Sequence, residues 1–329
     1  MTKIAESILV TGGAGFIGSY VCKKLLERKY QPVVYDAFIQ YVSPFDSYYQ
    51  KFLEIRFKDN KDHIIFERGD TRDKNHIRTV ILKYEPELII HLANLPIADL
   101  SFEHPEEAIG SIINGTVNIL DVVREVDFVK RFVYISSSII YGDFIEIPAP
   151  EEHPKRPKDI YGGTKLSAEI LIETYGRRYG IKYTIIRPSA VYGPTDVNRR
   201  VSQIFLENAV KGQKLILHGG GENILDFTYV EDTAEGIVLA SLSPRGENEA
   251  FNITRGEGRT LLEYMNILRH YFPNLETEIK PMQWYRPKRG ALGIQKAKEL
   301  LGYDPQFSLE KGIELYVRFM QDVRKELSR

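Results

Sequence analysis

The chain has 329 residues, 43% of them hydrophobic and 27% charged, which is enough for a large buried core in one or two domains. Its 44 basic and 45 acidic residues leave a net charge of -1, so neither nucleic acid nor an anionic membrane is an expected partner. With a single cysteine, seven scattered histidines and no apolar run of about 18 residues, we expect no disulfide, no metal site, no membrane span and a cytoplasmic location.

Short apolar runs typical of buried strands alternate with helix-like segments along the first half of the chain. The expected strands are 8–10, 33–35, 64–66, 88–92, 132–135 and 183–186, and the expected helices are 16–29, 73–84, 105–126 and 159–179. Because parallel strands need crossover connections, this alternation predicts an α/β fold with a doubly wound parallel sheet. Ligands of such sheets bind beyond the carboxyl ends of the strands. Residues 40–60, rich in tyrosine and charge, indicate an insertion or a helical loop to which no role is assigned.

The first strand-to-helix connection carries Gly12, Gly15 and Gly18 in a G-x-x-G-x-x-G spacing. Glycine lets the backbone approach a ligand closely, and the helix that follows, from Phe16 and Ile17, directs its free N–H groups toward an anion. The turn therefore predicts a pyrophosphate site, although an ordinary strand-to-helix connection can also look like this.

Two acidic residues follow the next strands. Asp36 stands 18 residues after Gly18, where a carboxylate can bind both hydroxyls of an adenosine ribose and repel a 2′-phosphate. This position favours NAD over NADP, and the alternative is a solvated loop carboxylate. Asp70 could hold the adenine amino group, but a Gly-Asp turn explains it almost as well.

A serine, a tyrosine and a lysine form the candidate catalytic group. Three serines end the strand at 132–135, and Tyr161 and Lys165 share one face at the start of a later helix. An ammonium beside a phenol should lower the tyrosine pKa from its ordinary value near ~10, so that Tyr161 can act as a general base. Tyr-x-x-x-Lys also occurs on surface helices by chance, but its place behind a dinucleotide motif favours catalysis.

The chain resembles the extended short-chain dehydrogenase/reductase family over nearly its whole length. Within that family it looks most like the NAD-dependent nucleotide-sugar epimerases and dehydratases, the UDP-glucose 4-epimerase-like group. The resemblance rests on Thr11-Gly-Gly-Ala-Gly-Phe-Ile-Gly18, Asp36, Gly69-Asp-Thr-Arg-Asp73 and His91-Leu-Ala-Asn94.

This resemblance implies a Rossmann-type sheet with a smaller C-terminal α/β substrate-binding domain, NAD as cofactor and a nucleotide-diphosphate sugar as substrate. It implies residues 1–187 plus 226–254 for the NAD-binding domain and 188–225 plus 255–329 for the substrate-binding domain. It also suggests a homodimer through the helices near 105–126 and 159–179.

The resemblance implies site residues as well. In the family, the catalytic Ser or Thr lies four residues before the Tyr of a Tyr-Gly pair, which from Tyr141 gives Ser137, with Ser136 and Ser138 as fallbacks. The expected cofactor-binding residues are Gly12, Gly15, Phe16, Ile17, Gly18, Asp36, Asp70, Thr71, Leu92, Ala93, Lys165 and Pro188. The expected substrate-binding residues are Ser138, Arg199, Arg200, Arg286 and Arg289, the arginines as diphosphate contacts, although Arg199 and Arg200 could equally start a solvated helix.

The two residues after Ser137 narrow the range of reactions that the chain is expected to catalyse. Related dehydratases carry an Asp-Glu pair there and related decarboxylases a glutamate at the second place, but this chain has Ser138-Ile139. The only cysteine, Cys22, lies in the first helix, which disfavours a cysteine-dependent 3,5-epimerase. We therefore expect epimerisation at C4. The alternatives are a sugar dehydrogenase or 4-reductase with net redox and, more remotely, an NAD-sensing protein without activity.

Three positions depart from the family pattern. Ala190 and Leu225 replace an asparagine and an arginine that commonly help to hold the substrate diphosphate, so the identity of the substrate stays open. Ile112 replaces an asparagine that faces the catalytic lysine or the cofactor, which leaves Ser111 or Asn114 to take its place.

Overall fold

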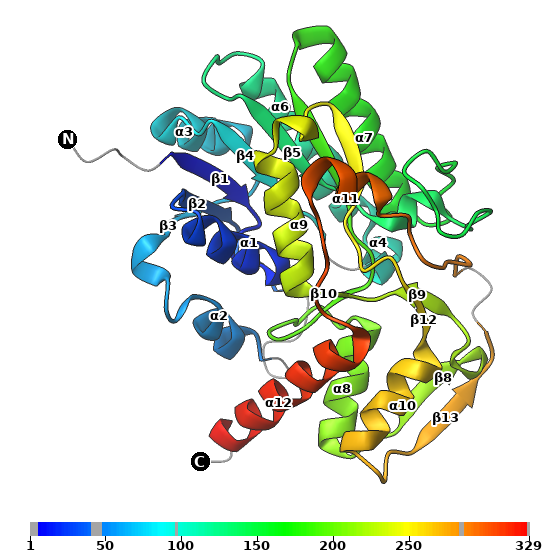
Figure 1. The fold of residues 1–329 in the computed structure, drawn as a ribbon. Helices are drawn as coiled ribbons and strands as arrows, with labels where there is room; N and C mark the ends of the chain where they lie inside the picture. The colour runs from blue at the N-terminus through cyan, green and yellow to red at the C-terminus, as the bar shows by residue number, and fades with distance from the viewer. Residues whose placement is uncertain (1–5, 41–47, 96–97, 283–285, 328–329) are drawn as a thin grey trace.

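The computed structural model describes residues 6–40, 48–95, 98–282 and 286–327, and a seven-stranded parallel sheet lies at its centre (Figure 1). The strand order is β11, β6, β5, β4, β1, β2, β3, which confirms the expected doubly wound Rossmann-type sheet. The bounds are β1 (Ser7–Thr11), β2 (Gln31–Asp36), β3 (Ile65–Arg68), β4 (Leu88–His91), β5 (Arg131–Ile135), β6 (Tyr183–Arg187) and β11 (Glu249–Asn252).

Helices cover both faces of this sheet because its strands are apolar on both sides. Along β1, for example, Val10 packs into the core beneath one layer of helices and Leu9 into the core beneath the other. The first layer is α1 (Phe16–Glu27), α9 (Val230–Leu242) and α11 (Gln295–Leu301), and the second is α3 (Lys74–Tyr84), α6 (Gly115–Val123) and α7 (Ile160–Tyr179).

The prediction of a single helix over residues 105–126 is wrong in detail. After α4 (Ala98–Glu103), the chain forms α5 (Pro105–Ala108), a π-helical turn η2 (Ile109–Asn114) and then α6. The hydroxyl of Ser111 donates to the Glu107 carbonyl at 2.7 Å and that of Thr116 to the Ile112 carbonyl at 2.6 Å. Such bonds compete with helical backbone bonding and accompany local distortion of a helix.

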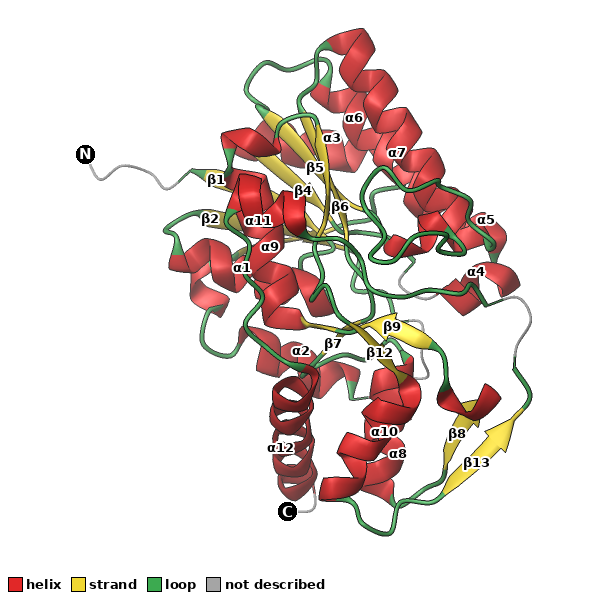
Figure 2. Cartoon of the chain, turned by 45° about the vertical axis from the view of Figure 1, so that its right-hand side comes forward, coloured by secondary structure: helices red, strands yellow, loops and turns green. Residues whose placement is uncertain are grey.

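Most of the chain after β6 forms a second body beside the sheet (Figure 2), with its own apolar core. Its helices are α8 (Val201–Lys211), α10 (Leu261–Tyr271) and α12 (Leu309–Leu327). Its strands pair as β7 (Val191–Tyr192) with β10 (Thr228–Tyr229), β9 (Ile224–Asp226) with β12 (Gly258–Thr260), and β8 (Leu215–His218) with β13 (Thr277–Lys280). Short 3-10 turns are η1 (Lys61–His63), η3 (Ser138–Tyr141), η4 (Gly219–Gly221) and η5 (Pro244–Gly246).

Helix α2 (Tyr49–Phe57) occupies the stretch that the sequence left unassigned, and it joins the two cores. Phe52 is fully buried in the second core, with its ring centroid 5.4 Å from that of Phe319 on α12. Phe57 belongs to the sheet-side core, edge-on to Phe66 at 5.0 Å. One short helix thus touches both bodies.

No helix within the described ranges is long and apolar enough to cross a membrane. Among the same residues, no cluster of three His, Cys, Asp or Glu side chains could bind a metal ion.

Candidate active site

A cavity of about 670 Å³ opens at the carboxyl ends of the central strands and extends toward the second body. Most of the residues predicted from the sequence line it. They are Gly12, Gly15, Phe16, Ile17, Gly18, Asp36, Asp70, Thr71, Leu92, Ala93, Ser137, Tyr161, Pro188, Arg199, Arg200, Arg286 and Arg289. Lys165 and Ser138 do not line it, because both side chains are buried behind its wall.

The glycine loop is packed so closely that neither Gly12 nor Gly18 has space for a side chain. Gly12 has a φ of +69°, and a Cβ on it would lie 2.7 Å from the Ala93 nitrogen at the end of β4. A Cβ on Gly18 would lie 2.4 Å from the Gly12 carbonyl oxygen. The loop is therefore pressed between β4 and α1, and the first turn of α1, from Phe16 to Gly18, lines the cavity, as a pyrophosphate site at a helix N-terminus requires.

Asp36 is held at the end of β2 by two backbone donors, the Ala14 N–H at 3.0 Å and the Phe38 N–H at 2.8 Å. Burial raises its pKa, while these bonds and the Arg56 charge oppose the rise. A carboxylate offers about four acceptor sites, so capacity remains for ribose hydroxyls.

The carboxylate of Asp70 is already bound by a neighbouring arginine. Burial raises its pKa, but hydrogen bonds from Arg72 more than offset this and leave it below the ordinary value. Arg72 also binds Glu107 at 2.6 Å. An adenine contact through Asp70 remains a prediction.

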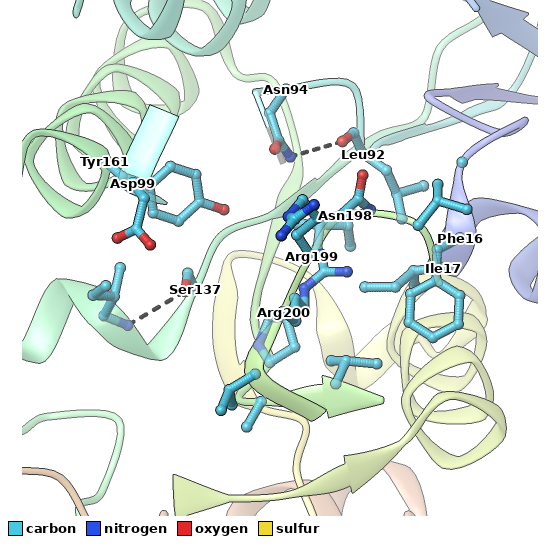
Figure 3. Close-up of a pocket in the computed structure, with 18 of the residues that line it drawn as sticks. Phe16, Ile17, Leu92, Asn94, Asp99, Ser137, Tyr161, Asn198, Arg199 and Arg200 are labelled. Atoms are coloured by element: carbon cyan, nitrogen blue, oxygen red, sulfur yellow. Dashed lines mark hydrogen bonds between the residues drawn. The ribbon is translucent and has the colours of Figure 1, made fainter. Parts of the chain in front are cut away.

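Ser137 and Tyr161 line the same cavity from different elements (Figure 3). Ser137 caps η3, its Oγ accepting a hydrogen bond from the Ile139 N–H at 3.3 Å. Of the two fallback serines, Ser136 lines the cavity and Ser138 is fully buried. Neither hydroxyl has a hydrogen-bond partner among the residues that the structure describes.

Lys165 approaches Tyr161 from behind the cavity wall. Its Nζ donates to the Ile135 carbonyl at 2.8 Å and lies 5.8 Å from the centre of the Tyr161 ring. Burial lowers the pKa of Lys165 to about 7, and the Glu169 charge one helical turn away opposes this.

The expected lowering of the tyrosine pKa is wrong in this structure. Burial raises the pKa of Tyr161 to about 12, with Arg200 acting to lower it and Asp159 to raise it. Removal of the phenol from water thus outweighs the nearby positive charge.

A buried ion pair fixes α7, the helix that carries Tyr161 and Lys165. Arg187 of β6 binds Glu169 of α7 through two bonds of 3.0 and 2.8 Å, and both side chains are almost fully buried. Arg187 also donates to the Tyr141 hydroxyl at 2.9 Å, and that hydroxyl donates to Asn252 at 2.8 Å. This network ties α7 to β6, η3 and β11.

Arginines reach the cavity from two segments. Arg200, just before α8, binds Asp196 at 2.8 Å and lies 5.7 Å from the centre of the Phe16 ring. Arg289 comes from the segment before α11, where burial lowers its pKa to about 10 and Asp159 opposes the shift. Both segments bring positive charge to a site expected to hold a diphosphate.

The three departures from the family pattern lie at or near the cavity. Ala190 and Leu225 line it with apolar side chains. Ile112 is fully buried and does not line it. Of the two proposed replacements, Ser111 lines the cavity, whereas Asn114 is exposed outside it.

Several lining residues were missed by the sequence reasoning. Asp159 caps α7 by accepting a hydrogen bond from the Gly162 N–H at 2.6 Å, a role that the N-cap preference could have revealed. Asp99 of α4 and Arg56 of α2 had no local signal, because only the fold brings them to the cavity. Asn94 and Asn198 also line it (Figure 3).

Comparison with known proteins agrees with this geometry. A model of the NAD dependent epimerase/dehydratase family matches residues 8–254. A putative UDP-glucose 4-epimerase of Methanocaldococcus jannaschii is 32% identical over 328 residues, covering 96% of this chain and 98% of that protein.

Many solved structures are similar to this chain, and two of them illustrate the likeness over almost its whole length. The UDP-glucose 4-epimerase of Thermotoga maritima, with UDP-glucose, is 31% identical with a TM-score of 0.86, covering 97% of this chain and 99% of that one. The UDP-glucuronic acid 4-epimerase of Bacillus cereus, with UDP-glucuronic acid and NAD, is 26% identical with a TM-score of 0.88, covering 96% and 99%. The chain therefore belongs to the NAD dependent epimerase/dehydratase family of extended short-chain dehydrogenases/reductases, and its cofactor is NAD.

Proposed function

We propose that this protein is a nucleotide-sugar 4-epimerase. The observation that carries the proposal is that Ser137 and Tyr161 line one cavity with the glycine loop, while Ile139 also lines it. Ile139 stands where related dehydratases and decarboxylases have a glutamate, and its side chain cannot transfer a proton.

The described residues fit NAD. The glycine loop and the start of α1 would hold the pyrophosphate and Asp36 the adenosine ribose, and Ser136 and Pro188 line the cavity where the nicotinamide end would lie. When bound, NAD supplies the hydride acceptor and donor and, in its oxidised form, a positive charge that favours the tyrosine anion.

In this proposal, Tyr161 takes the proton of the sugar 4-hydroxyl and later returns it to the same oxygen. Ser137 donates a hydrogen bond to that oxygen and orients it. The Lys165 ammonium, 5.8 Å from the Tyr161 ring centre, adds positive charge next to the phenol. A second aromatic ring, that of Tyr134, lies 4.8 Å from Lys165 Nζ, but Tyr134 does not line the cavity.

The substrate diphosphate would lie against the arginines. Arg199 and Arg289 have no hydrogen bond from their guanidinium groups to any residue within the described ranges, so their donors are available to a phosphate. They would compensate for Ala190 and Leu225, whose apolar side chains cannot bind a phosphate.

Tyr161→Phe tests this mechanism on UDP-glucose, UDP-glucuronate and the corresponding dTDP- and GDP-sugars. We expect turnover of the preferred substrate to fall about 10²- to 10⁴-fold, the usual contribution of a general acid–base. Tyr134→Phe is the matched control, because its hydroxyl has no partner in the described structure, and it should keep near-normal turnover. Near-normal turnover of Tyr161→Phe would refute the mechanism.

Net redox chemistry is the alternative, and the nicotinamide absorbance band distinguishes it. An epimerase should show no lasting absorbance change while its sugar product forms. Stoichiometric NADH accumulation would instead identify a dehydrogenase, and a 4-keto-6-deoxy product would identify a dehydratase.

The homodimer also remains a proposal. Ile109 on η2 and Ile170 on α7 are 45% and 55% exposed, so each could contribute apolar contacts to a dimer interface along these helices. Light scattering should give twice the chain mass, and Ile170→Glu should reduce it to one chain.

A further inference from the structure

Arg56, near the end of α2, holds together two segments that line the cavity from different bodies. Its Nη1 donates to the carbonyl of Ala14, in the middle of the glycine loop, at 2.8 Å. Its Nη2 donates to the carbonyl of Thr195 at 2.5 Å, and its Nε lies 3.4 Å from the Thr195 hydroxyl. A single side chain thus bonds to both walls.

Both backbone polar groups of Ala14 form hydrogen bonds with side chains. Its N–H donates to Asp36 at 3.0 Å, and its carbonyl accepts from Arg56. Burial lowers the pKa of Arg56, and the charges of Asp196 and Asp36 are among those that oppose this. The guanidinium is thus stabilised by the charge of one carboxylate from each body.

The other wall, residues 194–200, has a backbone that needs support. Thr195 has a φ of +70°, a conformation unfavourable for a β-branched residue. A weaker bond also reaches this turn from α1, in which the Tyr20 hydroxyl donates to the Pro194 carbonyl at 3.3 Å. The same segment brings Asn198, Arg199 and Arg200 to the cavity.

Helix α2 is itself anchored in the second body. Phe52 is buried there against Phe319 of α12. Because this packing fixes the position of α2, the Arg56 side chain can hold both walls in place.

We propose that Arg56 is a positioning residue that locks the glycine loop to residues 194–200 and so slows the release of NAD. Separation of these two walls would widen the cavity, and it requires breaking the charge-assisted hydrogen bonds of a partly buried guanidinium. The value of a retained cofactor to the enzyme rests on the proposed epimerisation, but the lock concerns only the NAD site.

The test measures NADH release without any sugar, by stopped-flow loss of bound-NADH fluorescence after dilution into excess NAD. Release should be at least tenfold faster from Arg56→Met than from the wild type, and Arg56→Lys should fall between them. Lys51→Met is the matched control on the same helix, because Lys51 touches α12 and not the loop, and its release rate should equal that of the wild type.

An unchanged release rate in a folded Arg56→Met protein would overturn the proposal, as would an equal acceleration in Lys51→Met. If Arg56→Met does not fold, Arg56→Lys decides the question, since a single ammonium cannot reproduce the bonds of the guanidinium to both Ala14 and Thr195. Release a few-fold faster supports the lock, and an unchanged rate overturns it. Failure of epimerase activity in every variant would count against the proposed reaction and leave the release rates interpretable.

Discussion

Glu169→Gln should separate two roles of one buried carboxylate. Glu169 neutralises Arg187 through two hydrogen bonds of 3.0 and 2.8 Å, and its charge also acts on Lys165. The variant keeps the shape of the side chain and removes its charge, so stability and catalytic pH dependence should both change.

The loss of stability follows from burial. The two side chains are 1% and 2% exposed, and breaking such a pair costs about 3–5 kcal/mol because it leaves a buried charge unpaired. Glutamine retains one acceptor for Arg187, which places the cost near the lower end, about 3 kcal/mol. At roughly 2–4 °C per kcal/mol, Tm should fall by about 6–12 °C.

The expected change in the pH dependence of kcat arises from the pKa of Lys165. Burial lowers its pKa to about 7, and the Glu169 carboxylate opposes this by favouring the ammonium. Removing that negative charge should lower the pKa further. If the Lys165 ammonium is needed for turnover, the alkaline limb of kcat against pH moves to lower pH in Glu169→Gln.

A double variant, Glu169→Gln with Arg187→Met, distinguishes the two effects. It removes the unpaired charge but also the Arg187 bonds to the Tyr141 hydroxyl and the Glu151 carbonyl, so thermal unfolding should recover only part of the lost Tm. The alkaline limb should stay shifted because Lys165 still lacks its anion. A wild-type limb in both variants would show that Glu169 does not influence Lys165. A wild-type Tm in the single variant would refute the stability argument.

Three further variants test the cavity. Gly18→Ala puts a Cβ 2.4 Å from the Gly12 carbonyl oxygen, so NAD affinity in a fluorescence titration should fall at least tenfold; unchanged affinity would mean that the loop adapts freely. Asp36→Asn should raise affinity for NADP relative to NAD, because it removes repulsion of the 2′-phosphate, and a constant ratio would contradict the ribose assignment. Asp99→Asn should raise turnover of UDP-glucuronate relative to UDP-glucose by about tenfold, as expected when one carboxylate stops repelling another across the cavity. An equal ratio would place Asp99 away from the sugar.

The parts of the fold and site that follow local rules could be predicted from the sequence. The strand–helix alternation predicted the sheet, and the glycine loop and Asp36 lie at the carboxyl ends of β1 and β2. Ser137 and Tyr161 line the cavity as predicted, since each stands at a fixed distance from a recognisable strand or helix boundary. Their chemical roles remain predictions.

The features of the fold and site that could not be predicted depend on contacts between segments far apart in the sequence. Arg56 reaches the glycine loop only because Phe52 anchors α2 in the second core, and no pattern in residues 40–60 encodes that. The pKa of Tyr161 was misjudged for a similar reason: sequence spacing revealed the lysine beside it but not the extent to which packing removes the phenol from water.

The π-helical turn at Ile109–Asn114 makes chain length a determinant of the site. A π-helical turn holds about one residue more than an α-helical turn, so deletion of one residue here would restore a regular α-helix and redirect the side chains within the turn, while the helices on either side keep their orientation. Ser111 would then turn away from the cavity, with no change in the chemistry of any remaining side chain. A one-residue gap in this helix between two relatives is thus equivalent to a substitution in the active site, and an alignment that places it in the nearest loop would conceal it.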